Sequence, residues 1–449
     1  MRADRPDARA VVESVADPTT WEPWTPAAQP ESVVTGCARI HGRPVALVVS
    51  EFGVAGGSIG ATAGARIVDA VRTATARRLP LLALPASGGT RMQEGTPAFL
   101  QMAAITAAVT EHREAGLPYL VYLRHPTTGG VFASWGSLGD LTWAQPGALT
   151  GFLGPKVYEG IYGEPFPPGV QQSDNLHRLG LIDDVFDVAD VRGRVDRVLE
   201  AIDPAGRSVR QPGRSTRRAT PASDAWAAVV ATRAAGRHGL AELESLLGAV
   251  TVAGDGPVRV CLARFGGRPT VMVGQDRRIQ DDGRLIDAAA LRVARRAIAL
   301  AVGWRLPLVS VVDTSGGELS RAAEEAGLAR QIAHCTAELL AAPTPTVSVL
   351  LGQGTGGAAL AMFPADRVFG VADAWLAPLP PEGAGIIMHG DVGRAAEMAR
   401  SQHIWVRDLH RLGIVDEVVE DLPGVVDAID AWIAGGVRAD RAGRVRVGQ

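Results

Sequence analysis

The sequence predicts an α/β protein built from two similar domains. Short apolar runs alternate with alanine-rich stretches of helical period, and this alternation favours sheets that are covered by helices on both faces. Four motifs recur in the same order about 227 residues apart, which indicates two copies of one fold unit. A chain of 449 residues, 47% of them hydrophobic, can bury two cores of ordinary size.

The repeated motifs define the two copies. They are, each with its counterpart, Arg78-Leu79-Pro80-Leu81-Leu82 and Arg305-Leu306-Pro307-Leu308-Val309, Ser87-Gly88-Gly89 and Ser315-Gly316-Gly317, Thr128-Gly129-Gly130 and Thr355-Gly356-Gly357, His177-Arg178-Leu179-Gly180 and His410-Arg411-Leu412-Gly413. Their offsets are 227, 228, 227 and 233 residues. We expect a first domain over residues 1–202, a linker over 203–223 that is rich in Pro, Gly, Ser and Arg, and a second domain over 224–449.

Within each copy the expected elements follow the alternation. Strands are expected at residues 45–49, 81–84, 119–123 and 347–351, and helices at 61–78 and 101–115. The glycine clusters come directly after strands and before helices, where backbone N–H groups lack acceptors and can face an anion. A function for this chain has to explain that placement in both copies.

Composition excludes several classes of function. The chain has 45 basic and 48 acidic residues, so its net charge of −3 gives no electrostatic reason to bind nucleic acid or an anionic membrane. Its three cysteines lie far apart, so we expect buried reduced thiols. The residues show no metal-ligand spacing, no signal peptide and no membrane span, so we expect a soluble, cytoplasmic protein without a catalytic metal.

Two motifs match known catalytic or binding patterns, but the surrounding sequence does not fit those functions. Gly56-Gly57-Ser58-Ile59-Gly60 satisfies the G-x-S-x-G of a hydrolase nucleophile elbow, but no local signature provides the histidine and acid that Ser58 would need. Gly352-Gln353-Gly354-Thr355-Gly356-Gly357 satisfies the dinucleotide pattern G-x-G-x-x-G, but it lies deep in the second copy. A tight glycine turn is the simpler interpretation of each.

Both copies have a Gly-Gly at the start of a helix. Paired amides at such a position form a preorganised oxyanion hole, because the missing side chain lets a carbonyl oxygen approach. Two such holes suit a reaction in which two enolate-like species coexist. Arg91, in the first turn after the earlier glycine motif, indicates either an anionic ligand or a salt bridge with Glu94.

At these residues the sequence resembles the carboxyltransferase component of biotin-dependent acyl-CoA carboxylases, of the type that fuses β and α subunits in one chain. Residues 86–95, 125–140 and 146–157 resemble the β subunit, and residues 352–362 and 380–385 resemble the α subunit. The resemblance implies two tandem crotonase-like domains, a β-like domain on the acyl-CoA side and an α-like domain on the biotin side. It also implies a site where a first half meets a second half, usually of different protomers.

Carried over by position, the resemblance implies site residues. The amides of Gly129 and Gly130 would hold the thioester oxygen, and those of Gly357 and Ala358 would hold the biotin carbonyl oxygen. The residues implied to bind substrate are Gly88, Gly89, Arg91, Gly154, Gly316 and Gly356. No side chain need act as a base.

The implied reaction moves CO₂ from carboxybiotin to acetyl-CoA or propionyl-CoA, giving malonyl-CoA or methylmalonyl-CoA. Carboxybiotin would come from a separate carrier chain, because the only lysine, Lys156, lies outside any Met-Lys-Met biotinylation hairpin. The implied partners are biotin carboxylase, the biotin carrier, the coenzyme A thioester and a second copy of this chain in a homodimer or larger homo-oligomer.

The sequence departs from the family at three places, one of which is the basic segment Thr232-Arg233-Ala234-Ala235-Gly236-Arg237-His238, which lacks the usual proline. The zinc ribbon of the β subunit is missing, as in fused versions, and the family's Asp-Thr-Pro-Gly turn reads Asp313-Thr314-Ser315-Gly316, followed by Gly317-Glu318-Leu319. Two alternatives therefore stay open. One is a fused pair of malonate-decarboxylase-type subunits acting on a malonyl thioester, and the other is a non-catalytic assembly subunit that keeps the fold.

Overall fold

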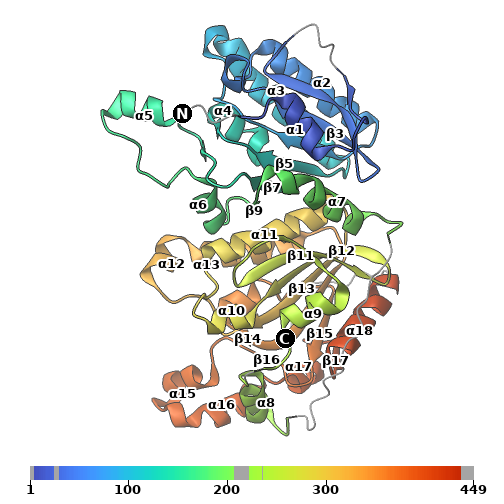
Figure 1. The fold of residues 1–449 in the computed structure, drawn as a ribbon. Coiled ribbons are helices and arrows are strands. Elements are labelled where there is room, and N and C mark those ends of the chain that lie inside the picture. Colours follow the sequence, from blue (N-terminus) through green and yellow to red (C-terminus); the bar gives the residue numbers. More distant parts are fainter. Residues whose placement is uncertain (1–4, 25–29, 207–221, 235, 436–449) are drawn as a thin grey trace. The chain divides into compact units, whose positions relative to one another are not determined.

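The chain divides into two compact units, Met1–Leu199 and Glu200–Gln449 (Figure 1). The structure, a computed structural model, describes residues 5–24, 30–206, 222–234 and 236–435. Each unit contains one large mixed sheet with helices packed against it, which confirms the α/β class and the duplication. Residues 207–221, the greater part of the expected linker, lie outside the described residues.

The first unit has one seven-stranded sheet and one small sheet. Its strands are β1 (Glu22–Pro23), β2 (Val33–Ile40), β3 (Arg43–Ser50), β4 (Leu81–Leu84), β5 (Tyr119–Leu123), β6 (Thr127–Thr128), β7 (Leu141–Ala144), β8 (Thr150–Gly151) and β9 (Asp184–Val185). Its helices are α1 (Ala8–Val15), α2 (Ala61–Ala76), α3 (Thr96–Glu114), α4 (Gly129–Phe132), α5 (Pro155–Tyr162), α6 (Ser173–Arg178) and α7 (Val191–Ile202). The large sheet has the order β1-β2-β3-β4-β5-β7-β9, and β6 pairs with β8.

The second unit repeats this plan. Its strands are β10 (Val250–Ala253), β11 (Val258–Phe265), β12 (Arg268–Gln275), β13 (Leu308–Thr314), β14 (Thr346–Thr355), β15 (Arg367–Val371), β16 (Trp375–Ala377) and β17 (Glu417–Val419). Its helices are α8 (Ala225–Thr232), α9 (Leu240–Leu247), α10 (Arg277–Asp281), α11 (Ala288–Gly303), α12 (Arg321–Glu325), α13 (Leu328–Ala341), α14 (Gly356–Leu360), α15 (Pro381–His389), α16 (Ala395–Ser401), α17 (Val406–Arg411) and α18 (Leu422–Gly435). The sheet order is β10-β11-β12-β13-β14-β15-β17, with β16 on the end of β14.

The two sheets correspond strand by strand. An antiparallel hairpin, β2-β3 in one unit and β11-β12 in the other, leads into strands that run parallel. The small β6-β8 sheet of the first unit corresponds to the pairing of β16 with the end of the long strand β14. A parallel sheet of this kind must be covered on both faces. Accordingly, Ala46 and Val48 pack into one core while their alternating neighbours Val45, Leu47 and Val49 are equally buried.

The expected elements agree closely with the observed ones. β4 and β5 have the expected bounds, and β14 extends past residue 351 to Thr355. α3 begins at Thr96 rather than at residue 101, because Gly95 (φ 61°) and Pro97 provide a helix start. Among the described residues, no helix combines the length and apolar character needed to cross a bilayer.

Candidate active site

Two short helices begin with glycines that share one backbone geometry. α4 begins at Gly129, directly after β6, and α14 begins at Gly356, directly after β14. Gly129 has φ 63° and Gly356 has φ 65°, in the left-handed region that glycine adopts without strain. A Cβ atom added at Gly129 would lie 3.4 Å from the Gly88 carbonyl oxygen, and one added at Gly356 would lie 3.4 Å from the Pro378 carbonyl oxygen. The two helix starts are therefore equivalent positions of the repeated fold.

The amides that follow these glycines are the candidate oxyanion-hole donors. Gly130 and Gly357 occupy the second helical position, and Val131 and Ala358 occupy the third. N–H groups in a first helical turn have no intrahelical acceptor, and neither N-cap threonine caps its helix with its side chain. In this register Gly130 matches Gly357. The amide pairs that the resemblance implies, which begin at Gly129 and at Gly357, are thus offset by one residue between the units.

The glycine turn that precedes each helix is also duplicated, in a register that differs from the one expected. The Gly89 N–H donates to Ser87 Oγ at 3.0 Å, and the Gly316 N–H donates to Thr314 Oγ1 at 3.0 Å. Gly89 (φ 109°) and Gly316 (φ 126°) are therefore equivalent, 227 residues apart. The offset of 228 taken from the two Ser-Gly-Gly motifs is wrong, because the hydroxyl that closes the turn belongs to a serine in one unit and to a threonine in the other.

Arg91 is held in an ion-pair network of the first unit. Its guanidinium donates to the Glu31 carboxylate, to Glu94 Oε1 at 3.1 Å and to the Ser58 carbonyl oxygen at 3.0 Å. Burial raises the pKa of Glu31, but hydrogen bonds from Arg91 and from the Ser32 amide outweigh it and hold that pKa below its ordinary value. The salt bridge that the sequence offered as one of two explanations for Arg91 is therefore present.

The two remaining glycines of the first unit lie in different surroundings. Gly88 borders the start of α4 and donates its own N–H to the Gly56 carbonyl oxygen at 3.0 Å. Gly154 is the N-cap of α5, where an added Cβ would meet nothing within 4 Å. Gly88 is thus fixed in the glycine turn beside α4, whereas Gly154 starts a separate helix.

A buried acid supports the corresponding turn of the second unit. Asp313, fully buried at the end of β13, accepts hydrogen bonds from Arg237 Nη2 at 2.5 and 2.7 Å and from the Gln353 amide at 3.1 Å. Burial raises the pKa of Asp313, and the Arg237 guanidinium opposes that effect. A Cβ at Gly352 would lie 2.6 Å from Asp313 Oδ1, so this glycine leaves room for the ion pair.

Neither of the two familiar motifs forms the site that its pattern suggests. Gly352 and Gly354 lie inside β14 and not in a strand-to-helix turn, so G-x-G-x-x-G does not form a dinucleotide-binding loop. Ser58 Oγ donates to the Ala55 carbonyl oxygen at 2.8 Å and accepts from Arg91 Nε at 3.4 Å, and no histidine contacts it among the described residues. The described residues also contain no cluster of His, Cys, Asp and Glu that could hold a metal ion.

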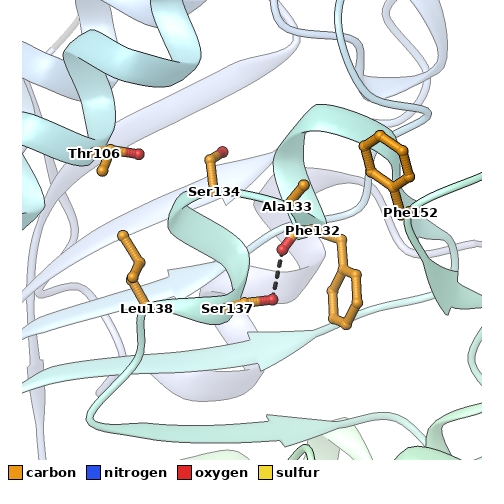
Figure 2. A pocket seen from close by; sticks show the side chains of 7 residues that line it. All are labelled: Thr106, Phe132, Ala133, Ser134, Ser137, Leu138 and Phe152. Carbon is orange, nitrogen blue, oxygen red and sulfur yellow. Dashed lines mark hydrogen bonds between the residues drawn. The ribbon is translucent and has the colours of Figure 1, made fainter.

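A hollow of about 380 Å³ borders α4 (Figure 2). Its lining comes from α3, from the end of α4 and the segment after it, and from the residue after β8, and consists of Thr106, Phe132, Ala133, Ser134, Ser137, Leu138 and Phe152. Ser134 Oγ donates to the Gly130 carbonyl oxygen at 2.5 Å, which ties this lining to the candidate hole. The side chain of Phe152 is 70% exposed. The hollow therefore adjoins the last residue of α4, Phe132, and combines apolar with hydroxyl side chains.

Sequence reasoning missed two buried polar residues at the ends of strands. Arg124 follows β5 and Gln275 ends β12, and both donate to backbone carbonyl oxygens. Each is the first polar residue after an apolar run, which was the only signal that the sequence carried. A buried polar side chain needs hydrogen-bond partners, so each of these two residues makes specific hydrogen bonds inside the fold.

Two family models match the chain. The model described as "Carboxyl transferase domain" matches residues 21–178, and the model described as "Acetyl co-enzyme A carboxylase carboxyltransferase-like" matches residues 237–435. A relative from Mycobacterium tuberculosis, "Probable biotin-dependent acyl-coenzyme A carboxylase beta3 subunit", is 54% identical over 404 residues, which cover 88% of this chain and 81% of the relative. One from Salinispora arenicola, "Acetyl-coenzyme A carboxylase carboxyl transferase subunits beta/alpha", is 36% identical and covers 89% of this chain and 76% of the relative.

Solved structures share the fold. A transcarboxylase 12S structure superposes with a TM-score of 0.79 at 21% identity, covering 97% of this chain and 91% of that one. A single-chain, multi-domain long-chain acyl-CoA carboxylase gives 0.71 at 19% identity, covering 96% of this chain and 46% of that one. These matches confirm the expected fold of two tandem crotonase-like domains.

Proposed function

The chain belongs to the carboxyltransferase family of biotin-dependent acyl-CoA carboxylases, and we propose that it transfers CO₂ from carboxybiotin to the α-carbon of acetyl-CoA or propionyl-CoA. The products would be malonyl-CoA or methylmalonyl-CoA, which supply fatty-acid biosynthesis. The observation that carries this proposal is the duplicated helix start, which gives each unit a first-turn amide at Gly130 or Gly357 without a helical acceptor.

We assign the two amide sets to two carbonyl oxygens. Gly129 and Gly130 would hold the thioester oxygen of acyl-CoA, so that negative charge can develop there when the α-proton leaves. Gly357 and Ala358 would hold the biotin carbonyl oxygen. The substrate would pass beside other glycines, which are Gly88, Gly89 and Gly154 in the first unit and Gly316 and Gly356 in the second. Arg91 would stabilise the first-unit part of this path.

One backbone feature of the second unit supports the proposed biotin carbonyl site. An added Cβ at Gly357 would lie 2.8 Å from Ile332 Cδ1, so the glycine keeps the first turn of α14 free of a side chain. When bound, carboxybiotin supplies activated CO₂. The residues of this chain would orient the biotin carbonyl and shield it from water, and no side-chain base is assigned.

The hollow beside α4 supports an acyl site in the first unit. Phe132, Leu138 and Phe152 give it an apolar lining, and it shares α4 with the proposed thioester donors. A short acyl chain that leaves the held carbonyl would be accommodated there.

We further propose that the chain works as a cytoplasmic homodimer or larger homo-oligomer together with a biotin carboxylase and a biotin carrier. Each unit provides one amide set, and a twofold arrangement of two chains would create two complete sites. The three cysteines fit a reducing compartment, because burial raises the pKa of Cys37, Cys261 and Cys335 and keeps these thiols unreactive.

An assay of the purified protein with free biotin tests the proposal. We expect carboxyl transfer from malonyl-CoA or methylmalonyl-CoA to free biotin, which leaves acetyl-CoA or propionyl-CoA, and a negative avidin blot of the protein itself. Loss of CO₂ from a malonyl carrier protein without biotin would instead identify a decarboxylase. Complete inactivity of the folded protein with every acyl-CoA would identify a non-catalytic subunit.

A further inference from the structure

Gln275 is a fully buried glutamine at the end of β12 that joins three elements of the second unit. Its Nε2 donates to the Ala358 carbonyl oxygen at 2.8 Å. Its Oε1 accepts from the Asp313 N–H at 3.1 Å. One side chain therefore connects the end of β12, the end of β13 and the first turn of α14.

The hydrogen bond from Gln275 takes the place of the helical hydrogen bond that the Ala358 carbonyl oxygen lacks. α14 ends at Leu360, so the donor that would normally serve the Ala358 carbonyl from four residues further on is the Met362 N–H. That N–H instead bonds the Ala359 carbonyl oxygen at 3.1 Å. A helix of five residues is also too short to be stable by itself, so its orientation must come from contacts with the sheet.

The described part of the first unit has no such connection at the corresponding position. The pairing of Ala46 with Leu81 and of Val271 with Leu308 makes Ser50 the counterpart of Gln275, four residues further along each strand. The Ser50 hydroxyl is buried and has no hydrogen-bond partner among the described residues. The tie between the sheet and the helix start is therefore a property of the second unit.

We propose that Gln275 is a positioning residue for the biotin-side oxyanion hole. It holds the Ala358 carbonyl, which shares a peptide plane with the Ala359 N–H, and so fixes the orientation of the short helix α14. The N–H groups of Gly357 and Ala358, in the same helical turn, would then keep a fixed direction toward the biotin carbonyl oxygen. Preorganised donors stabilise charge only while their direction is fixed. The inference rests on the proposed function, because it assigns Gln275 to the half of the reaction that uses biotin.

The test compares two glutamines of one buried network. Gln275→Met keeps the length of the side chain and removes both hydrogen bonds. Gln280→Met is the matched control, since Gln280 is also buried but bonds the Asp313 carbonyl oxygen at 3.0 Å and Thr314 Oγ1 at 2.7 Å rather than α14. Two half-reactions are measured: decarboxylation of free carboxybiotin without acyl-CoA, and α-proton exchange of acetyl-CoA in heavy water.

Gln275→Met should slow carboxybiotin decarboxylation about tenfold, the size expected for losing the one of its two hydrogen bonds that reaches α14, and change α-proton exchange less than about twofold. Gln280→Met should produce no such difference between the half-reactions. Hydrogen–deuterium exchange gives a readout that is independent of activity. The peptide over 352–362 should exchange faster in Gln275→Met than in wild type, and the peptide over 125–134 should not change.

Equal loss of both half-reactions, or unchanged exchange in the 352–362 peptide, would overturn the assignment. If Gln275→Met does not fold by circular dichroism, Gln275→Asn replaces it, because asparagine stays polar but is one methylene too short to reach Ala358. A wild-type protein that catalyses neither half-reaction would refute the proposed function itself, so the two failures can be told apart.

Discussion

The two units have the same backbone at their helix starts and different side chains beneath it. Gly129 and Gly356 differ by only 2° in φ, and the glycine turns before them close on a hydroxyl in the same way. Apart from that hydroxyl, the side chains that support these turns differ between the units. A site made of backbone amides constrains conformation and leaves side-chain identity free, so the repeated halves have diverged around a preserved geometry.

In the first unit the support is a buried cation. Arg124 Nε donates to the Leu84 carbonyl oxygen at 3.2 Å, and its Nη2 donates to the Ser50 carbonyl oxygen, so one guanidinium joins the ends of β3 and β4. Burial lowers the pKa of Arg124 to about 10, although the charge of Glu51 opposes this, and the group stays protonated at neutral pH.

In the second unit the support is a neutral amide and a compensated ion pair. Leu351 stands where the first unit has Arg124, and Gln275 with the Asp313–Arg237 pair joins the strand ends instead. The strands of the first unit thus end beside a positive charge, whereas those of the second unit end beside a neutralised network. If each unit holds one oxyanion as proposed, the two units would stabilise their oxyanions to different degrees.

The largest expected effect comes from removing one amide at a time. Gly130→Pro, Gly357→Pro and Ala358→Pro each delete an N–H within a first helical turn, where proline is tolerated, and each should lower turnover by about 10² or more. The first should act mainly on α-proton exchange of acyl-CoA. The other two should act mainly on carboxybiotin decarboxylation.

Alanine variants control for packing. Gly130→Ala and Gly357→Ala keep the N–H and add only a Cβ, which would approach Thr90 Oγ1 at 2.9 Å or Ile332 Cδ1 at 2.8 Å. If alanine is as damaging as proline, the effect is steric and the amides are not the donors. If Ser58→Ala abolishes activity while the folded proline variants stay active, the nucleophile-elbow interpretation is right instead.

Mixing two inactive variants tests whether the units cooperate between chains. A dimer of one Gly130→Pro chain and one Gly357→Pro chain would have one site with both defects and one site with neither. Random exchange of chains should then restore about a quarter of wild-type activity, because half of the dimers are mixed. Measuring turnover after unfolding and refolding the mixture checks this, and no recovery would mean that each site belongs to one chain.

The hollow beside α4 predicts a smaller effect, on specificity. Ala133→Phe should fill the space and lower kcat/KM for propionyl-CoA about tenfold more than for acetyl-CoA, since one methylene in an apolar pocket is worth about 1–3 kcal/mol. Ala133→Ser, which leaves the volume nearly unchanged, is the control. Equal losses with both substrates would place the acyl group elsewhere.

The sequence predicted the fold through its repeats, and the turns show where such prediction stops. The Arg-Leu-Pro motifs led to the correct register because Arg78 (φ 53°) and Arg305 (φ 57°) occupy the same strained position before the strand. The Ser-Gly-Gly motifs led to a register one residue off. Residue identity is a weaker guide to the register there than the hydrogen bond that closes the turn. Either hydroxyl, that of Ser87 or that of Thr314, can accept this bond from the glycine N–H.

The start of the long helix shows a second kind of divergence. Asp287 caps α11 in the second unit by accepting from the Ala290 N–H at 2.7 Å. In the first unit Gly60 stands at the N-cap, and the distant Glu94 accepts from the Ala61 N–H at 2.6 Å. A long-range cap of this kind has no local sequence signature. The same limit hid Gln275 and Arg124, whose partners are separated from them by 38 to 83 residues.

The smallest expected effect concerns the free energy of unfolding. It arises at a position where the two units carry opposite charges. Arg91 of the first unit corresponds to Glu318 of the second, because the Arg91 N–H donates to the Ile59 carbonyl oxygen and the Glu318 N–H donates to that of Ile286, both at 2.9 Å. Removing the charge of Glu31, the partner of Arg91, should lower the free energy of unfolding by about 2 kcal/mol at neutral pH. Glu318→Gln is the control and should change it by less than about 0.5 kcal/mol, because Glu318 accepts a hydrogen bond from the half-buried Ser320 hydroxyl that glutamine can also accept.

The variant Glu31→Gln removes this charge, and the resulting loss of stability should depend on pH. The folded-state pKa of Glu31 is lower than its ordinary value, so the ion pair adds stability above the unfolded pKa of about 4.3 and loses it as pH falls through the folded pKa. The stability difference between wild type and Glu31→Gln should therefore be largest near pH 7 and shrink in acid. Urea unfolding at several pH values measures it, and a difference that stays constant down to pH 3 would show that Glu31 acts by packing rather than by its charge on Arg91.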